Sequence, residues 1–81
     1  MNKKETELLI EVRLFATLRE GRFDKKVLEF SKSATLTDVM EDLGIPQKKI
    51  GILLVNGKSS VLQQTLSAND VVSIFPAIGG G

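Results

Sequence analysis

Residues 33–46, SATLTDVMEDLGIP, carry the clearest helix pattern in the chain and constrain its fold most. The apolar side chains recur at the i, i+3, i+4, i+7 spacing of one helix face: Leu36, Val39, Met40 and Leu43. Thr35 and Asp38 are spaced as in a capping box, which puts negative charge at the positive end of the helix dipole. Gly44 supplies a left-handed C′ residue, and Pro46 prevents continuation. The sequence predicts one short helix with defined ends.

The segments before this helix alternate as half-buried strands do. In residues 8–16, LLIEVRLFA, one side carries Ile10, Val12 and Leu14, and the other carries Leu9, Glu11, Arg13 and Phe15. Residues 25–31, KKVLEFS, alternate in the same way. Because the TLREGR between them contains a glycine and mixed charges, it predicts a turn. Together these segments predict an opening hairpin.

After the helix, residues 50–58, IGILLVNGK, form a nearly continuous apolar run that ends in Asn-Gly. Such a run is typical of a strand buried on both faces, and Asn-Gly predicts a two-residue turn. A weak strand at residues 60–62 follows. Asn69-Asp70 predicts another turn, and residues 71–75, VVSIF, predict the last strand.

This element order, β-β-α-β-(β)-β, predicts an α+β fold in which one main helix packs on one face of a mixed, four- to five-stranded sheet. It is the order of the β-grasp (ubiquitin-like) fold, where the first and last strands lie side by side at the centre of the sheet. With 81 residues, the chain has room for one core. We expect the domain to span residues 1–75 and a flexible tail to occupy residues 76–81.

Composition excludes several classes of function. The chain has no His and no Cys, which leaves neither a zinc cluster nor a Ser-His-Asp triad. Its formal charge of +1 and the absence of Tyr and Trp argue against a nucleic-acid binder. Acidic residues interrupt the first fifteen positions, so these predict neither a signal peptide nor a membrane span. We therefore expect a cytoplasmic domain whose partner is another protein, without nucleic acid or membrane.

Three stretches, VRLFATLRE, VNGK and NDVVSIFPAIGGG, resemble the MoaD/ThiS family of sulfur carrier proteins. The resemblance extends from about residue 11 to residue 81. Phe75-Pro76 matches the Phe-Pro typical of the molybdopterin branch, whereas AIGGG is also a common ending in the thiamine branch. The RLFATLRE stretch and the longer N-terminal portion favour the molybdopterin branch.

The resemblance implies a carrier without catalytic side chains of its own. A ThiF/MoeB-type adenylating enzyme would use ATP to activate the terminal carboxylate of Gly81, and a sulfur donor protein would then convert it to a thiocarboxylate. No cofactor or metal would be bound. The acceptor would be the large subunit of molybdopterin synthase, with this chain as the small subunit. Thiazole synthase in a thiamine or related pathway, a ubiquitin-like modifier role for Gly81, and an interaction domain with an idle tail remain alternatives.

The physical chemistry of the ending agrees with a carrier. An ionised terminal carboxylate must enter a partner's ATP site to be activated. Glycine permits close backbone approach there, and six residues reach roughly 20 Å when extended. Ile78, Gly79 and Gly80 would thread into the partner's active site, and Pro76 should end strand pairing.

A partner must also dock beside the tail. Phe15 and Phe75 each fall on the more polar side of their strands, so neighbouring first and last strands would join them into one apolar patch. With Pro76, they are the predicted docking residues. The resemblance places a third contact near Ser59, with Val61 or Leu62 as substitutes.

Overall fold

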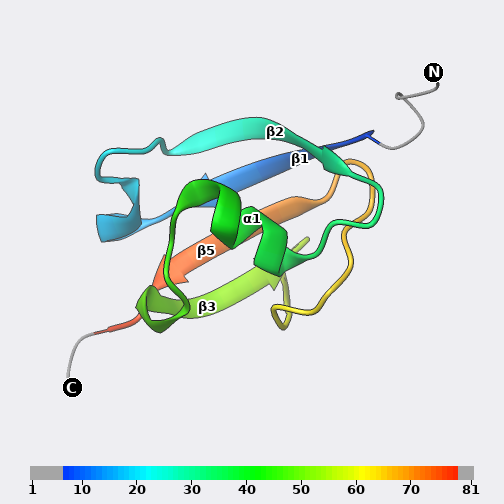
Figure 1. Cartoon of the computed structure of the whole chain (residues 1–81). Coiled ribbons are helices and arrows are strands. Elements are labelled where there is room, and N and C mark those ends of the chain that lie inside the picture. The colour runs from blue at the N-terminus through cyan, green and yellow to red at the C-terminus, as the bar shows by residue number, and fades with distance from the viewer. Residues whose placement is uncertain (1–6, 79–81) are drawn as a thin grey trace.

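The computed structural model describes residues 7–78. Its elements are β1 (Glu7–Leu14), the 3-10 helix η2 (Ala16–Arg19), β2 (Lys25–Ser31), α1 (Leu36–Leu43), the 3-10 helix η3 (Gln47–Lys49), β3 (Ile50–Val55), β4 (Lys58–Ser59) and β5 (Val71–Pro76). The strands form one sheet in the order β2-β1-β5-β3-β4 (Figure 1). β1 and β5 are parallel neighbours, and every other pair is antiparallel. The predicted hairpin and central strand pair are confirmed.

Helix α1 begins and ends where the sequence predicts. The backbone N–H of Thr35 donates to the Asp38 carboxylate at 2.8 Å, and Gly44 ends the helix with φ of 69°. Arg22, in the η2–β2 loop, donates from Nε to the Leu43 carbonyl at 3.1 Å and from Nη1 to the Leu18 carbonyl at 3.2 Å. A cation is favourable at a helix C-terminus. This arginine therefore connects the loop to the end of α1, a contact that periodicity does not predict.

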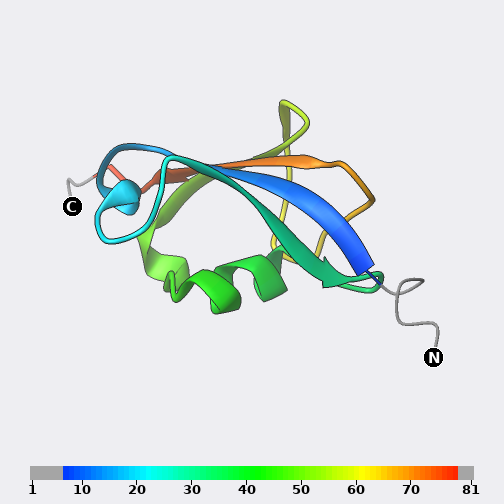
Figure 2. The same cartoon turned by 90° about the horizontal axis from the view of Figure 1, so that it is seen from above.

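The helix covers one face of the sheet and leaves the other face open (Figure 2). The core lies between them, and its largest fully buried side chains are Ile10, Val12, Leu14, Leu36, Val39, Val72 and Ile74. The prediction that β3 is buried on both faces is wrong. Leu53 and Val55 point into the core, but Ile52 remains 52% exposed because no element among residues 7–78 packs over that side of β3.

The position of the fourth strand also differs from the prediction. Asn56 and Gly57 form the predicted two-residue turn, with φ of 53° and 82°. A turn this short pairs the residues that directly flank it, so Lys58–Ser59 form β4 and the expected strand at residues 60–62 is absent. The segment predicted as the first turn, residues 17–22, overlaps the short helix η2, which spans Ala16–Arg19.

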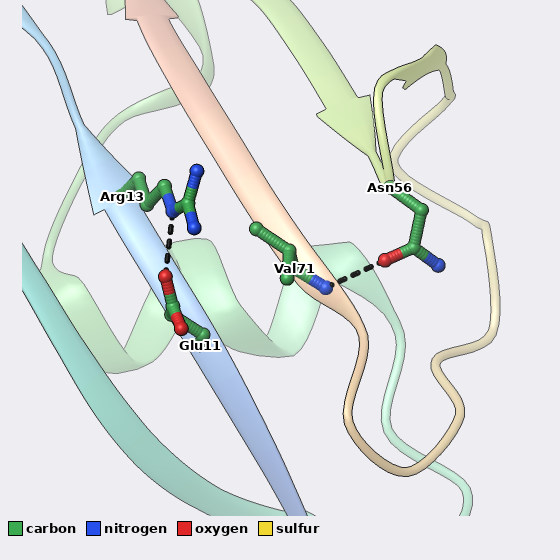
Figure 3. A network of polar contacts seen from close by, with 4 residues as sticks. All are labelled: Glu11, Arg13, Asn56 and Val71. Atoms are coloured by element: carbon green, nitrogen blue, oxygen red, sulfur yellow. Dashed lines mark hydrogen bonds and ion pairs between the residues drawn. The ribbon is translucent and has the colours of Figure 1, made fainter.

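A polar cluster fixes the start of β5. Asp70, only 9% exposed, accepts hydrogen bonds from Asn56 Nδ2 at 2.9 Å and from the Ser67 backbone N–H at 2.7 Å. Asn56 Oδ1 accepts from the backbone N–H of Val71 at 2.9 Å, as Figure 3 shows. The cluster ties the β3–β4 turn to the turn before β5, so it holds the strand that leads to the C-terminus.

Candidate functional site

Two phenylalanines stack where β1 and β5 end. The rings of Phe15 and Phe75 have centroids 4.1 Å apart and an interplanar angle of 10°. Phe15 lies one residue beyond β1, yet its N–H donates to the Ile74 carbonyl at 3.2 Å and so extends the parallel pairing. Both side chains are half-buried. The prediction that these two rings lie together is confirmed, while their docking role stays a prediction.

Arg19 supports the stack from its side. Its guanidinium carbon lies 5.6 Å from the Phe15 ring centroid, within cation–π range. Nε donates to the Leu14 carbonyl at 2.9 Å and lies 3.5 Å from the Asp24 carboxylate. The ring of Phe15 is thus bordered by a positive group whose position is set by the backbone of β1.

Ile52 extends the apolar surface across β5. It pairs with Phe75 in the β3–β5 register and is half exposed on the open face. We call the surface formed by Phe15, Ile52 and Phe75 the docking face. The sequence contained a usable pattern for Ile52, because Leu53 and Val55 alternate with it in β3. The continuous apolar run concealed that alternation.

The three residues predicted as a possible third contact differ in how exposed their side chains are. Ser59 is exposed in β4 and pairs with Leu54. Val61 is 62% exposed, whereas Leu62 packs against the core. Val61 is therefore the more accessible of the two substitutes, and the third contact stays a prediction.

The tail begins later than predicted. Pro76 is the last residue of β5 and pairs with Ile50, and the Ala77 N–H donates to the Lys49 carbonyl at 2.9 Å. Strand β5 thus ends at Pro76, as predicted, and one further backbone hydrogen bond follows it, because proline removes only its own donor. We call Pro76 and Ala77 the tail root. Ile78 is 94% exposed, and the predicted thread residues Gly79 and Gly80 and the reactive Gly81 lie outside the described residues.

Charges elsewhere on the described residues do not form a reactive centre. Glu11 and Arg13 form an ion pair at 2.6 Å on the open face (Figure 3). The side chain of Glu29 raises the pKa of the Glu7 carboxyl, mainly through a hydrogen bond and to a lesser extent through repulsion between the two negative charges. Within residues 7–78, no three His, Cys, Asp or Glu side chains gather as metal ligands would, and no helix has the length and apolarity needed to cross a bilayer. The site offers a surface beside an emerging chain end.

Several solved structures share the fold of this chain. SAMP1, the small archaeal modifier protein 1 of Haloferax volcanii, is 26% identical; the match covers 90% of this chain and 99% of that one, with a TM-score of 0.70. A complex of subunits 1 and 2 of the molybdopterin-converting factor from Helicobacter pylori contains a chain 21% identical, with coverage of 91% and 100% and a TM-score of 0.61. A protein designed on the basis of ubiquitin is 20% identical, with coverage of 93% and 94% and a TM-score of 0.64. The last two likenesses show the fold alone, which is the predicted β-grasp, ubiquitin-like fold.

No curated protein sequence matches this chain. The model of the ThiS family, in contrast, matches residues 12–81, a range that includes β1 from Val12 onwards, the docking face, the tail root and the final glycines. That span exceeds half of the 81 residues. The chain belongs to the ThiS family of ubiquitin-like sulfur carriers.

Proposed function

We propose that this protein is a cytoplasmic sulfur carrier that serves as the small subunit of molybdopterin synthase. The observation that carries the proposal is the family match, which continues through the tail to Gly81. The reactive atom is the terminal carbonyl carbon of Gly81, activated by a ThiF/MoeB-type enzyme with ATP. The Phe75-Pro76 pair, which resembles the Phe-Pro typical of the molybdopterin branch, supports this branch.

The chemistry needs no catalytic side chain from the carrier. The terminal carboxylate attacks the α-phosphorus of ATP and displaces pyrophosphate, which gives an acyl adenylate. Sulfur at the sulfide level, delivered as HS⁻ by a sulfur donor protein, then attacks the adenylate carbonyl and displaces AMP. The products are the thiocarboxylate, AMP and one proton, so one oxygen of the original carboxylate is replaced by sulfur. The carrier's contribution is to present the tail and to hold the partner at the docking face, which lies directly beside the tail root.

Intact-mass spectrometry tests this proposal. After incubation with the adenylating enzyme, ATP and a sulfur donor, the chain should gain the mass difference between one sulfur and one oxygen. A chain lacking Gly80-Gly81 should gain nothing and should retain its melting temperature, because Ile78, the last described residue before this deletion, is almost fully exposed. An unchanged mass of the full chain in this complete mixture would refute the carrier role.

Two other roles are distinguished by the product. A modifier role is favoured by the likeness to SAMP1, and it would appear as an isopeptide between Gly81 and a target lysine. A thiamine-pathway role is favoured by the AIGGG ending. Incubation of the thiocarboxylated chain with the large synthase subunit and, separately, with a thiazole synthase separates the branches, because only the correct acceptor should consume the sulfur.

A further inference from the structure

Gly51 lies at an irregular point of the sheet, directly against the tail root. The β3–β5 register shifts between Ile50 and Ile52, which leaves Gly51 as a bulge residue. A Cβ at position 51 would lie 2.6 Å from the Pro76 carbonyl oxygen and 3.0 Å from Ala77 Cα. Both contacts are to backbone atoms, which cannot rotate away as a flexible side chain can. A glycine in a strand interior often marks such close backbone approach.

Backbone conformation does not explain the need for glycine at this position. The φ of Gly51 lies outside the left-handed region, unlike that of Gly21, Gly44 and Gly57. Any residue could adopt its φ, so the constraint is the space taken by the tail root. The missing side chain is what lets the two backbones meet.

The close contact is followed by a backbone hydrogen bond from Ala77, the last such bond among residues 7–78. The Ala77 N–H reaches the Lys49 carbonyl at 2.9 Å, which secures the tail root on the residues that precede β3. Ile78, the next residue, is almost fully exposed. Ala77 is therefore the point at which the direction of departure is set. The four residues from Ile78 to Gly81 reach about 13–14 Å when extended, so the position of Ala77 sets the centre of the region that the reactive end can reach.

We propose that Gly51 is a positioning residue for the carrier's tail. Because it has no side chain, the backbone of Pro76 and Ala77 can pack against it, and this contact fixes where the chain leaves the sheet relative to the docking face. This inference rests on the proposed carrier function. A partner held at the docking face can use the tail only if the terminal carbonyl arrives in its active site at the same time. A misplacement of about 1 Å can reduce a rate by about 100-fold.

Amide hydrogen exchange in the free protein tests, without any partner, whether Gly51 holds the tail root in place. Gly51→Ala should accelerate exchange at Ala77 by about 10-fold or more, because its bond to Lys49 is displaced. The Asn56 amide, which donates to the Val71 carbonyl at 2.8 Å elsewhere along the same strand pair, should retain its protection. Gly57→Ala is the matched control: it introduces a side chain at a left-handed φ of 82°, meets no atom within 4 Å, and should leave Ala77 protected.

Steady-state adenylation separates positioning from general weakening of the fold. Gly51→Ala should lower kcat by about 10-fold or more while KM stays within about twofold, because the docking face is unchanged. Gly57→Ala should leave both constants near those of the wild type. If Gly51→Ala does not fold, Ala77→Pro replaces it: this variant removes the N–H donor, keeps Gly51, and should show the same loss in kcat.

The possible results have distinct meanings. If the Ala77 amide exchanges at the wild-type rate in Gly51→Ala, Gly51 does not hold the tail root in place, and the proposal is overturned. Lost protection with unchanged kcat overturns the positioning role and leaves the carrier function intact. If the wild-type chain is not adenylated at all, the proposed function fails, and the positioning role of Gly51 fails with it. The exchange data still decide whether Gly51 holds the tail root in place.

Discussion

Replacing Asp70, a buried carboxylate, with alanine should destabilise the domain strongly. The Asp70 carboxylate accepts one hydrogen bond at 2.9 Å from the Asn56 side chain and one at 2.7 Å from the Ser67 backbone. Asp70 is 9% exposed, so water replaces these bonds poorly after truncation. Asp70→Ala therefore leaves a backbone donor without its acceptor and loosens the turn that starts β5.

The size of the effect follows from the two bonds. A hydrogen bond to a charged group contributes about 1.5–3 kcal/mol, and part of this is recovered where solvent reaches Asn56. We expect the free energy of unfolding to fall by about 2–4 kcal/mol. For a domain of this size, about 1 kcal/mol corresponds to roughly 4–8 °C, so the melting temperature should fall by about 8–32 °C. Asp70→Asn keeps one acceptor and should lose about half as much.

Far-UV circular dichroism is the appropriate assay because the chain has no Trp or Tyr for fluorescence. Urea titrations of wild type, Asp70→Ala and Asp70→Asn should be compared with Asp42→Ala, which removes an exposed carboxylate from α1 and should change stability by less than about 0.5 kcal/mol. A transition midpoint for Asp70→Ala equal to that of Asp42→Ala would refute the reasoning that this cluster holds β5.

Three further changes probe the helix end, the sheet edge and the docking face. Arg22→Ala removes the cation at the C-terminus of α1 and should cost about 1–2 kcal/mol in urea unfolding; no change would show that the helix end needs no such contact. Because the folded state raises the Glu7 pKa above 4.5, the folded protein holds its proton to higher pH, and stability should fall as pH rises through that raised pKa. Melting temperatures measured across this pH range should decline in the wild type but not in Glu7→Gln. If Glu7→Gln shows the same decline, the pH dependence comes from groups other than the Glu7–Glu29 pair. Phe75→Ala should weaken binding to the adenylating enzyme by about 30-fold in titration calorimetry while the domain stays folded. Val27 is an exposed apolar residue of β2, on the open side of the sheet but outside the docking face. Val27→Ala should therefore bind as the wild type does, and equal affinities for Phe75→Ala and Val27→Ala would count against the docking role.

The elements predicted well are those whose signals are local. The helix has its apolar face, its capping residues and its C-terminal glycine within fourteen positions of sequence, and α1 follows them. The Asn56-Gly57 turn is equally local. Local patterns do not report what covers a strand. The degree of burial of β3 depends on α1 covering only one face, which is a property of the assembled layers.

The candidate site was only partly predictable for the same reason. Alternation assigned Phe15 and Phe75 to one side of their strands, and the β-grasp order made those strands neighbours, so the stack could be predicted. Arg19 and Gly51 could not be found in this way. Arg19 reaches Phe15 through a 3-10 helix that had been predicted as a turn, and Gly51 is required by a register shift that only the paired strands reveal.

The parallel pairing of β1 and β5 would allow one end of this small sheet to serve both as the proposed docking surface and as the exit of the tail. In a parallel pair, the ends of both strands lie together, so Phe15 adjoins Phe75 and the tail root follows at once. Antiparallel pairing would place the end of β1 beside the start of β5. Phe15 would then lie about five or six residues, or roughly 17–20 Å, from Phe75 along the strand. A partner bound at Phe15 would then stand farther from the tail root than the four residues beyond Ala77 can span.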